Sequence, residues 1–128
     1  MENMVNIFLF GKKYEVPASL TIMDSSEGKT GKITGGNTRA KNAYIPGDGG
    51  GIYVDYGTLY LKGVTVTGNI AEYGAGIYCD DQDDALVYIQ DGTKIYGNTA
   101  SVSGGGIYME NGFLYLEDGE IRDNNAAN

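Results

Sequence analysis

The chain has 128 residues with a formal net charge of −8, and it contains 21 Gly, 11 Tyr, one Cys and no His or Trp. A single Cys excludes an internal disulfide, and no apolar run approaches the roughly 18 residues that span a bilayer. The charge is uneven, because residues 1–48 carry five acids and six bases (+1) while residues 49–128 carry twelve acids and three bases (−9). Such an acidic body repels nucleic acid and anionic lipid and attracts basic partners, so we expect no direct nucleic-acid binding and no membrane insertion.

The N-terminal segment, residues 1–19, is predicted to cap the fold. Ile7 to Val16 has the pattern of a strand, a turn at Gly11-Lys12-Lys13 and a second strand. Terminal caps of this kind keep the apolar interior of a repeat protein away from water. The segment lacks the positive start of a secretory signal peptide. We therefore expect a cytoplasmic location for the chain as it stands, or the cell surface if it is a fragment of a longer exported protein.

Residues 20–48 predict a degenerate first coil followed by a loop. Two of its segments match a later copy, and Asn37 then aligns with Asn98 after one inserted residue. The loop, residues 39–48, contains the turn-forming run Pro46-Gly47-Asp48. The matching segments are Leu20–Asp24 with Val87–Asp91 and Lys32–Gly35 with Lys94–Gly97.

Three regular copies make up the rest of the chain, over residues 49–73, 74–103 and 104–128. Each copy opens with a Gly-rich turn and a strand in which Tyr stands between two apolar residues. A second alternating strand and a third short segment ending in Asn follow. The three segments of the successive copies are Gly49–Val54, Leu59–Leu61 and Val66–Asn69; Gly74–Cys79, Val87–Ile89 and Ile95–Asn98; and Gly104–Met109, Leu114–Leu116 and Ile121–Asn124.

Three strands and three turns in about 25 to 30 residues predict one coil of a right-handed parallel β-helix. The chain is therefore expected to be a single all-β domain of about four coils with an N-terminal β cap. The apolar strand residues should form inward columns at roughly 4.8 Å spacing, with Cys79 as a small buried member. An Asn column, Asn37, Asn69, Asn98 and Asn124, is expected to hydrogen-bond between the coils.

The Gly-Gly-x-Ile and Ile/Val-x-x-Asn segments resemble the Gly-rich repeats of pectin-lyase-like β-helices, bacterial surface proteins, autotransporters and polymorphic outer-membrane proteins. The resemblance covers residues 20–128 and is most specific over residues 49–128. It implies the β-helical fold strongly. It implies function weakly, since this scaffold serves adhesins, polysaccharide-cleaving enzymes and inert stalks.

The Tyr residues of the alternating strands are the first candidate binding residues. They are predicted to point outward in two columns, since they alternate with the inward aliphatic residues. Tyr is favoured in interfaces because its rigid ring supplies contact area at little entropic cost. Stabilisation of the sheets by cross-strand contacts is the other interpretation, and the two are compatible. The columns are Tyr53, Tyr78 and Tyr108, and Tyr60, Tyr88 and Tyr115.

An acidic turn is the second candidate, because its additional residues lengthen one coil and insertions in repeat proteins often map to a binding face. Its side chains could bind Ca²⁺ or could be a solvated loop that discourages aggregation. The spacing fits neither an EF-hand nor a Gly-Gly-x-Gly-x-Asp repeat, so no metal and no cofactor are assigned. The acids of this turn are Asp80, Asp81, Asp83 and Asp84.

Catalysis is not expected. Lyases of this fold need a basic residue that abstracts a proton, and the repeat body has no His and only three bases. Paired acids such as Glu117, Asp118 and Glu120 could serve a hydrolase, but so few coils leave little room for a substrate cleft.

The sequence favours a non-catalytic binding protein, in one of two versions. The first is a surface or adhesin-type module that contacts protein or glycan through its Tyr faces. The second is a small acidic intracellular inhibitor, encoded by a phage or mobile element, that mimics nucleic-acid charge and blocks a nucleic-acid enzyme. A polysaccharide lyase or hydrolase fragment is a remote third interpretation. A homodimer through the C-terminal coil is expected as well, because no segment of sufficient length to cap that coil follows it.

Overall fold

The computed structural model describes residues 7–9, 18–38, 47–80 and 85–127, and within these residues every regular element is a β-strand. The strands form four sheets, which we call A to D. Sheet A contains β1 (Ile7–Leu9), β4 (Ile52–Val54), β8 (Ile77–Cys79) and β12 (Ile107–Met109). Sheet B contains β2 (Ser19–Met23), β5 (Thr58–Lys62), β9 (Ala85–Gln90) and β13 (Gly112–Leu116). Sheet C contains β3 (Lys32–Ile33), β6 (Thr65–Thr67), β10 (Thr93–Tyr96) and β14 (Gly119–Arg122). Sheet D contains β7 (Ile70–Tyr73), β11 (Thr99–Ser103) and β15 (Asn125–Ala126).

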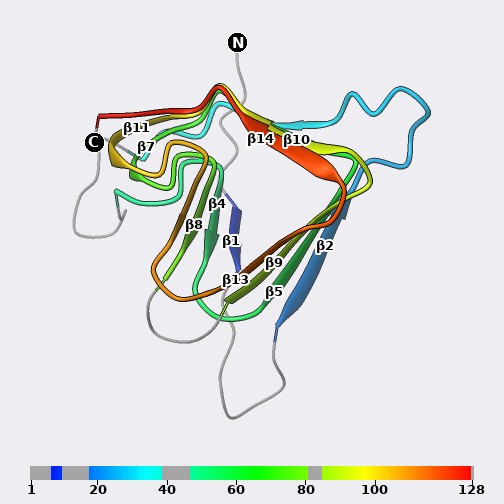
Figure 1. Ribbon diagram of the computed structural model, residues 1–128, viewed down its shortest axis with the longest axis horizontal. Coiled ribbons are helices and arrows are strands. Elements are labelled where there is room, and N and C mark those ends of the chain that lie inside the picture. The colour runs from blue at the N-terminus through cyan, green and yellow to red at the C-terminus, as the bar shows by residue number, and fades with distance from the viewer. Residues whose placement is uncertain (1–6, 10–17, 39–46, 81–84, 128) are drawn as a thin grey trace.

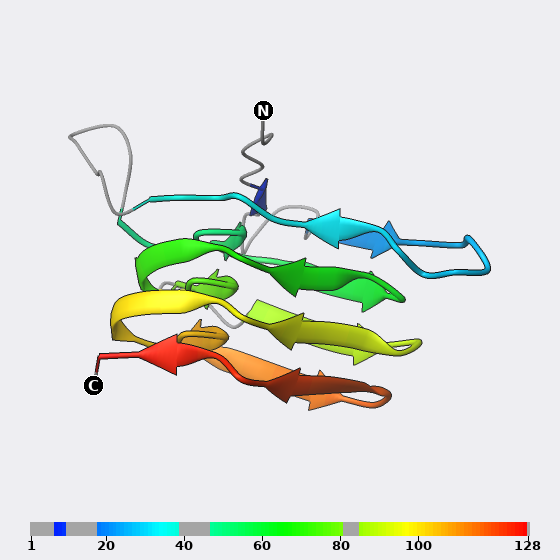
Figure 2. The same ribbon diagram turned by 90° about the horizontal axis from the view of Figure 1, so that it is seen from above.

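All described strand pairs are parallel, and each sheet joins strands from successive copies of the repeat. The chain visits sheets A, B, C and D in turn and then returns to sheet A one layer further along (Figure 1). Figure 2 shows the layers stacked on one another from the first described residues to the last. This arrangement is a parallel β-helix, which confirms the predicted fold class.

Each regular coil has four strands rather than the predicted three. The additional strand in each copy belongs to sheet D and begins directly after the Asn that ends the third segment. Its inward residues are Ala71, Ala100 and Ala126, which pack together with Ala75 as a small cluster separate from the main core. The inward residue is the small Ala in every copy, and the residues beside it differ from copy to copy, so hydrophobic periodicity alone did not reveal the strand.

The first strand, which lies in the segment predicted to be a cap, extends sheet A. β1 pairs in parallel with β4, with Ile7 opposite Ile52 and Leu9 opposite Val54. It is therefore the sheet A member of the first coil, because its residues extend the same inward columns. Most of the rest of the predicted cap, residues 10–17, lies outside the described residues, as do residues 39–46 of the predicted loop.

The core lies between sheets A, B and C and is built from the inward aliphatic columns. Ile52, Ile77, Leu61, Ile89 and Ile95 are fully buried, as the alternation predicted. Cys79 is also fully buried, between Val54 and Met109 in its column, which confirms its interpretation as a small core residue.

The Asn column forms a hydrogen-bonded ladder between the coils. The Asn69 main-chain N–H and side-chain amide both donate to Asn98 Oδ1, at 3.1 and 3.0 Å. Asn98 donates in the same way to Asn124 Oδ1, at 3.1 and 2.9 Å. Asn69 and Asn98 are fully buried, so these bonds satisfy backbone and amide groups that water does not reach.

The predicted place of Asn37 in this ladder is wrong. Asn37 forms a bridge with Ile70, so Gly36 is the residue that aligns with Asn69, and no residue is inserted. The Gly36 N–H donates to Asn69 Oδ1 at 3.0 Å. The first coil thus begins the ladder with a main-chain donor and no side-chain amide.

The Gly-rich turns are required by close approach between coils and by backbone conformation. A Cβ on Gly51 would lie 2.7 Å from the Gly76 carbonyl oxygen of the next coil, too close for any other residue. Gly74 has a φ of +59°, a left-handed conformation that favours Gly. These turns set the start of each sheet A strand and therefore the positions of its Tyr residues.

Candidate binding surfaces

In the Tyr column on sheet A, two of the three hydroxyls form hydrogen bonds within the chain. The rings of Tyr53 and Tyr78 stack with centroids 5.1 Å apart, and those of Tyr78 and Tyr108 stack at 5.6 Å. The Tyr53 hydroxyl donates to Asp80 Oδ2, and the Tyr78 hydroxyl donates to Glu110 Oε1 at 2.7 Å. Each hydroxyl is thus bound by an acid of the next coil, so this column contributes to the cohesion of the β-helix.

These contacts change the ionisation of the two phenols. Burial raises the pKa of Tyr53 and of Tyr78, and the hydrogen bonds to Asp80 and Glu110 and the nearby negative charge act in the same direction. Tyr78 is only 6% exposed because it lies between two other rings. Little of the Tyr78 surface can therefore touch a partner, and its predicted role as a contact residue stays a prediction.

The Tyr column on sheet B is more open. Tyr60 and Tyr88 stack with centroids 4.7 Å apart, as do Tyr88 and Tyr115. Within the described part of the chain, no hydrogen bond of the three hydroxyls is found. Tyr115 is 41% exposed, and Phe113 on the same face of β13 is 54% exposed. Sheet B therefore presents a row of hydroxyl groups beside an exposed aromatic ring.

The stacking of the sheet B rings determines which of their surfaces a ligand can contact. Both faces of the Tyr88 ring are covered by its neighbours, and burial raises its pKa, with the two neighbouring phenols adding to the effect. The hydroxyls repeat at the spacing of parallel strands. A flat platform for stacking a sugar ring is thus missing along the row, whereas hydrogen bonds to polar groups of a partner are possible at each coil.

The structure places only one acid of the predicted Asp turn. Asp80 accepts the hydrogen bond from Tyr53, and Asp81, Asp83 and Asp84 lie outside the described residues. No set of three or more His, Cys, Asp or Glu residues in the described ranges is placed to hold a metal ion. The calcium hypothesis stays untested.

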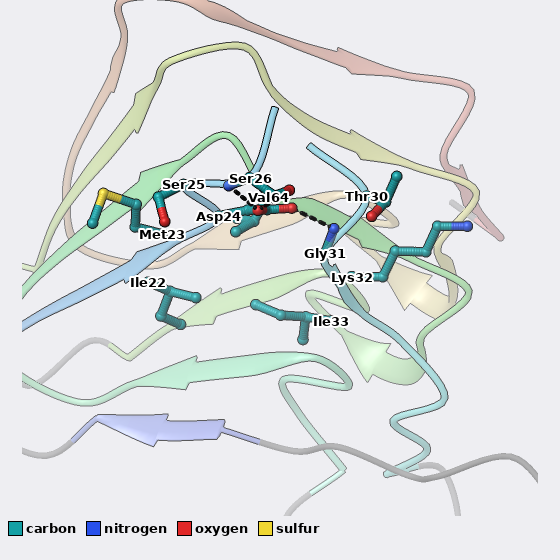
Figure 3. Close-up of a pocket in the computed structure, with 10 residues that line it drawn as sticks. All are labelled: Ile22, Met23, Asp24, Ser25, Ser26, Thr30, Gly31, Lys32, Ile33 and Val64. Carbon is teal, nitrogen blue, oxygen red and sulfur yellow. Dashed lines mark hydrogen bonds between the residues drawn. The ribbon is translucent and has the colours of Figure 1, made fainter. Parts of the chain in front are cut away.

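A hollow of about 620 Å³ lies on the first coil, between Ile33 and the turn that follows β2 (Figure 3). The carboxylate in this hollow belongs to Asp24, and both of its oxygens accept hydrogen bonds within the loop. The main-chain N–H groups of Ser26 and Gly31 donate to them at 2.8 and 2.6 Å. The Ser26 hydroxyl, followed by these two backbone groups, lowers the pKa of Asp24 to about 2. The acid therefore holds the loop and is not available as a catalytic acid or base.

Burial raises the pKa of the Cys79 thiol to about 12, so it is neither a nucleophile nor a metal ligand at neutral pH. The part of the chain that the structure describes contains no helix long and apolar enough to cross a membrane.

The repeat itself supplies a likeness to a known family. Residues 92–110, which include Asn98 and the Gly104–Gly106 turn, match the Chlamydia polymorphic membrane protein repeat. This stretch is similar to a surface-protein repeat. The match and the parallel strands together fit a surface or adhesin-type repeat module. No match was found among curated proteins, and none among solved structures.

Sequence reasoning missed the partners of the sheet A Tyr column. An acid follows the Gly-rich motif in every regular copy, as Asp55, Asp80 and Glu110. Two of these three acids accept a Tyr hydroxyl from the preceding coil. The recurrence was visible in the sequence and could have revealed them.

Proposed function

We propose that this chain is a non-catalytic binding module of the surface-repeat type, displayed at a cell surface, which contacts a protein partner through the outer face of sheet B. The observation that carries the proposal is the contrast between the two Tyr columns. The hydroxyls of Tyr53 and Tyr78 are bound within the chain, whereas those of Tyr60, Tyr88 and Tyr115 point outward in a regular row.

The composition of the sheet B face supports a protein partner. Rigid aromatic residues and free hydroxyls are typical of interfaces because they combine contact area with hydrogen bonding at low entropic cost. Phe113 and the half-buried Leu86 extend the aromatic row with apolar surface. Glycan is the second candidate ligand, and it would have to bind through the hydroxyls because the stacked rings cover one another.

The likeness to a surface-protein repeat supports the location. The β-helix is also suited to such a role because its outer faces repeat with every coil, while the core does not depend on them.

Removal of the hydroxyls tests the proposal directly. Labelled protein is applied to fixed host cells and to a glycan array, and a triple variant, Tyr60→Phe, Tyr88→Phe and Tyr115→Phe, keeps the stacked rings but lacks the hydroxyl row. We expect binding to cells to fall at least about tenfold, which corresponds to about 1.4 kcal/mol. Tyr96→Phe on sheet C is the matched control and should bind normally. Equal binding of the triple variant and the wild type would exclude the sheet B face as the contact surface.

A further inference from the structure

Asn111 and Gly112 form the only Asn-Gly pair of the sequence, and they lie at the turn between β12 and β13. Gly112 has a φ of +121°, a conformation that favours Gly. A Cβ at this position would also overlap the carbonyl oxygen of Ala85 in the preceding coil. The backbone and the packing of the two coils therefore require Gly directly after Asn111.

The side chain of Asn111 folds back onto the peptide nitrogen of Gly112. The Gly112 N–H donates to Asn111 Oδ1 at 3.0 Å. The ladder between β9 and β13 does not need this N–H, because the register gives that bond to the next residue, Phe113, as it does to Leu86 in the preceding strand pair. The nitrogen is thus held beside the carboxamide of Asn111, whose carbon Cγ it can attack.

The Asn residues of the buried ladder are arranged in the opposite way. Asn69 is followed by Ile70 and Asn98 by Thr99, and these branched side chains are stiff and crowd the backbone. The Ile70 N–H donates to Gly36 O at 2.8 Å, and the Thr99 N–H donates to Asn69 O at 2.9 Å. The nitrogen that follows each ladder Asn is therefore bound to a neighbouring coil and cannot approach the side-chain amide.

We propose that Asn111 is a site of spontaneous deamidation, in which its amide becomes a carboxylate through a cyclic succinimide. The Gly112 nitrogen loses its proton to solvent and bonds to Asn111 Cγ, and the Cγ–Nδ2 bond breaks with release of ammonia. Water then opens the ring. Addition at Cγ gives Asp, whereas addition at the main-chain carbonyl carbon gives isoaspartate, in which the backbone runs through the side chain. No oxidant or reductant takes part.

Water reaches this corner of the β-helix in each regular coil. Asp55 and Asp80 occupy the matching turns after β4 and β8, and both remain half-buried although a coil lies on either side of them. The water that opens the succinimide therefore has access at the turn itself. The site is separate from the Tyr hydroxyls of sheet B, so it does not depend on the proposed function.

The reaction would change the turn beside the Tyr78 contact. Glu110, the residue before Asn111, accepts the hydrogen bond of the Tyr78 hydroxyl at 2.7 Å. Either product places a second negative charge next to Glu110. Isoaspartate also adds a carbon atom to the backbone between Glu110 and β13, so we expect this form to lose the Tyr78 bond and the Asp form to keep it.

Peptide mapping of the aged native protein tests the proposal. The folded chain is incubated at physiological temperature and mildly alkaline pH, and mass spectrometry with chromatography separates the Asn, Asp and isoaspartate forms of each peptide. We expect the Asn111 amide to be lost at least about tenfold faster than the amides of Asn69 and Asn98, with both products formed. The rate should rise with pH, because the attacking nitrogen must lose its proton.

Asn111→Gln is the matched control. It keeps the carboxamide and the charge, but its longer side chain requires a larger ring, so loss of the amide should be at least about tenfold slower. The same mapping in urea gives the rate for the unfolded chain. Asn111→Asp supplies the charge without the backbone change, and thermal unfolding should show it close to the wild type, whereas the isolated isoaspartate form should unfold at a lower temperature.

Three outcomes would overturn the proposal. The first is an Asn111 amide that survives in the native protein as long as that of Asn98. The second is formation of Asp without isoaspartate, because direct hydrolysis gives Asp alone. The third is a native rate more than about tenfold below the rate in urea, which would show that the folded turn blocks the attack. An isoaspartate form that unfolds like Asn111→Asp would contradict the predicted loss of the Tyr78 bond.

Discussion

The third and fourth coils have nearly the same sequence pattern, yet the structure gives their matching residues very different surroundings. Ile95 and Ile121 are partners in sheet C, and the first is fully buried while the second is 37% exposed. The Tyr78 hydroxyl is bound by Glu110, whereas Tyr108, its partner one coil further on, has no such bond in the described part of the chain. A repeat residue thus acquires its energetic role from the coil that covers it, and not from its place in the motif.

The largest expected difference is at the matched Ile pair. Ile95→Ala should lower the free energy of unfolding by about 2 to 5 kcal/mol, because it opens a cavity in a closed core. Ile121→Ala should cost less than about 2 kcal/mol, since part of that side chain already contacts water. Urea unfolding followed by circular dichroism measures both. Equal costs would mean that the last coil is covered in solution.

The Asn ladder gives the next largest effect. Asn98→Ala should cost about 2 to 4 kcal/mol, because in a buried site it removes the acceptor of the Asn69 main-chain N–H, one of the two acceptors of the Asn69 side-chain amide, and the amide that donates to the Val66 carbonyl oxygen. Asn124→Ala should cost about half as much, since it is the outermost member and is partly exposed. The same unfolding measurement applies, and a larger loss at Asn124 would contradict the ladder as described.

The hydroxyls of Tyr78 on sheet A and Tyr115 on sheet B should differ by a smaller amount in their contribution to the free energy of unfolding. Tyr78→Phe removes the hydrogen bond to Glu110 and should cost about 0.5 to 1.5 kcal/mol, while Tyr115→Phe should be close to neutral. Thermal unfolding of the two variants provides the comparison. A destabilised Tyr115→Phe variant would show that its hydroxyl is bound by a group outside the described residues.

Alkaline pH should lower the stability of the folded chain through Tyr53 and Tyr78. The pKa values of Tyr53 and Tyr78 are raised in the folded chain above the unfolded value of about 10. The folded state then keeps protons that the unfolded state loses, so this stabilisation is complete below about pH 10 and declines as the pH rises further. Absorbance at the phenolate band should show late-titrating Tyr in the native protein. Tyr78→Phe should lose part of this late titration, and an unchanged profile would contradict the assignment.

The smallest effect concerns Cys79, which should not react with a thiol reagent at pH 8 until the chain unfolds, because its pKa is raised to about 12 and it is fully buried. The rate of reaction with Ellman's reagent, with and without urea, checks this. Rapid reaction of the native protein would place Cys79 outside the core.

The fold class and the inward residues could be predicted from sequence, because Tyr alternates with aliphatic residues in every copy and the period fixes which side is buried. The fourth strand could not, since Ala and Thr in β11 carry little hydrophobic contrast. Asn37 was wrongly placed in the ladder because the comparison of the copies matched one Asn with another and did not follow the register of Ile33 with Val66, which puts Gly36 opposite Asn69. The distinction between the two Tyr columns also escaped prediction, because it depends on Asp80 and Glu110 lying within reach of hydroxyls a full coil away.

The Asn ladder also bears on how a chain of this kind can change in length through evolution. Every rung runs the same way, with the donor on the earlier coil and the acceptor on the later one, and it begins at Gly36, which needs only a main-chain N–H. Duplication of a coil between Asn69 and Asn124 inserts two donors, a main-chain N–H and a side-chain amide, together with one acceptor oxygen, so the rungs on either side remain matched. Recombination within the repeats can therefore lengthen or shorten the rod without redesigning its ends, whereas a duplication that included Gly36 would interrupt the ladder inside the core.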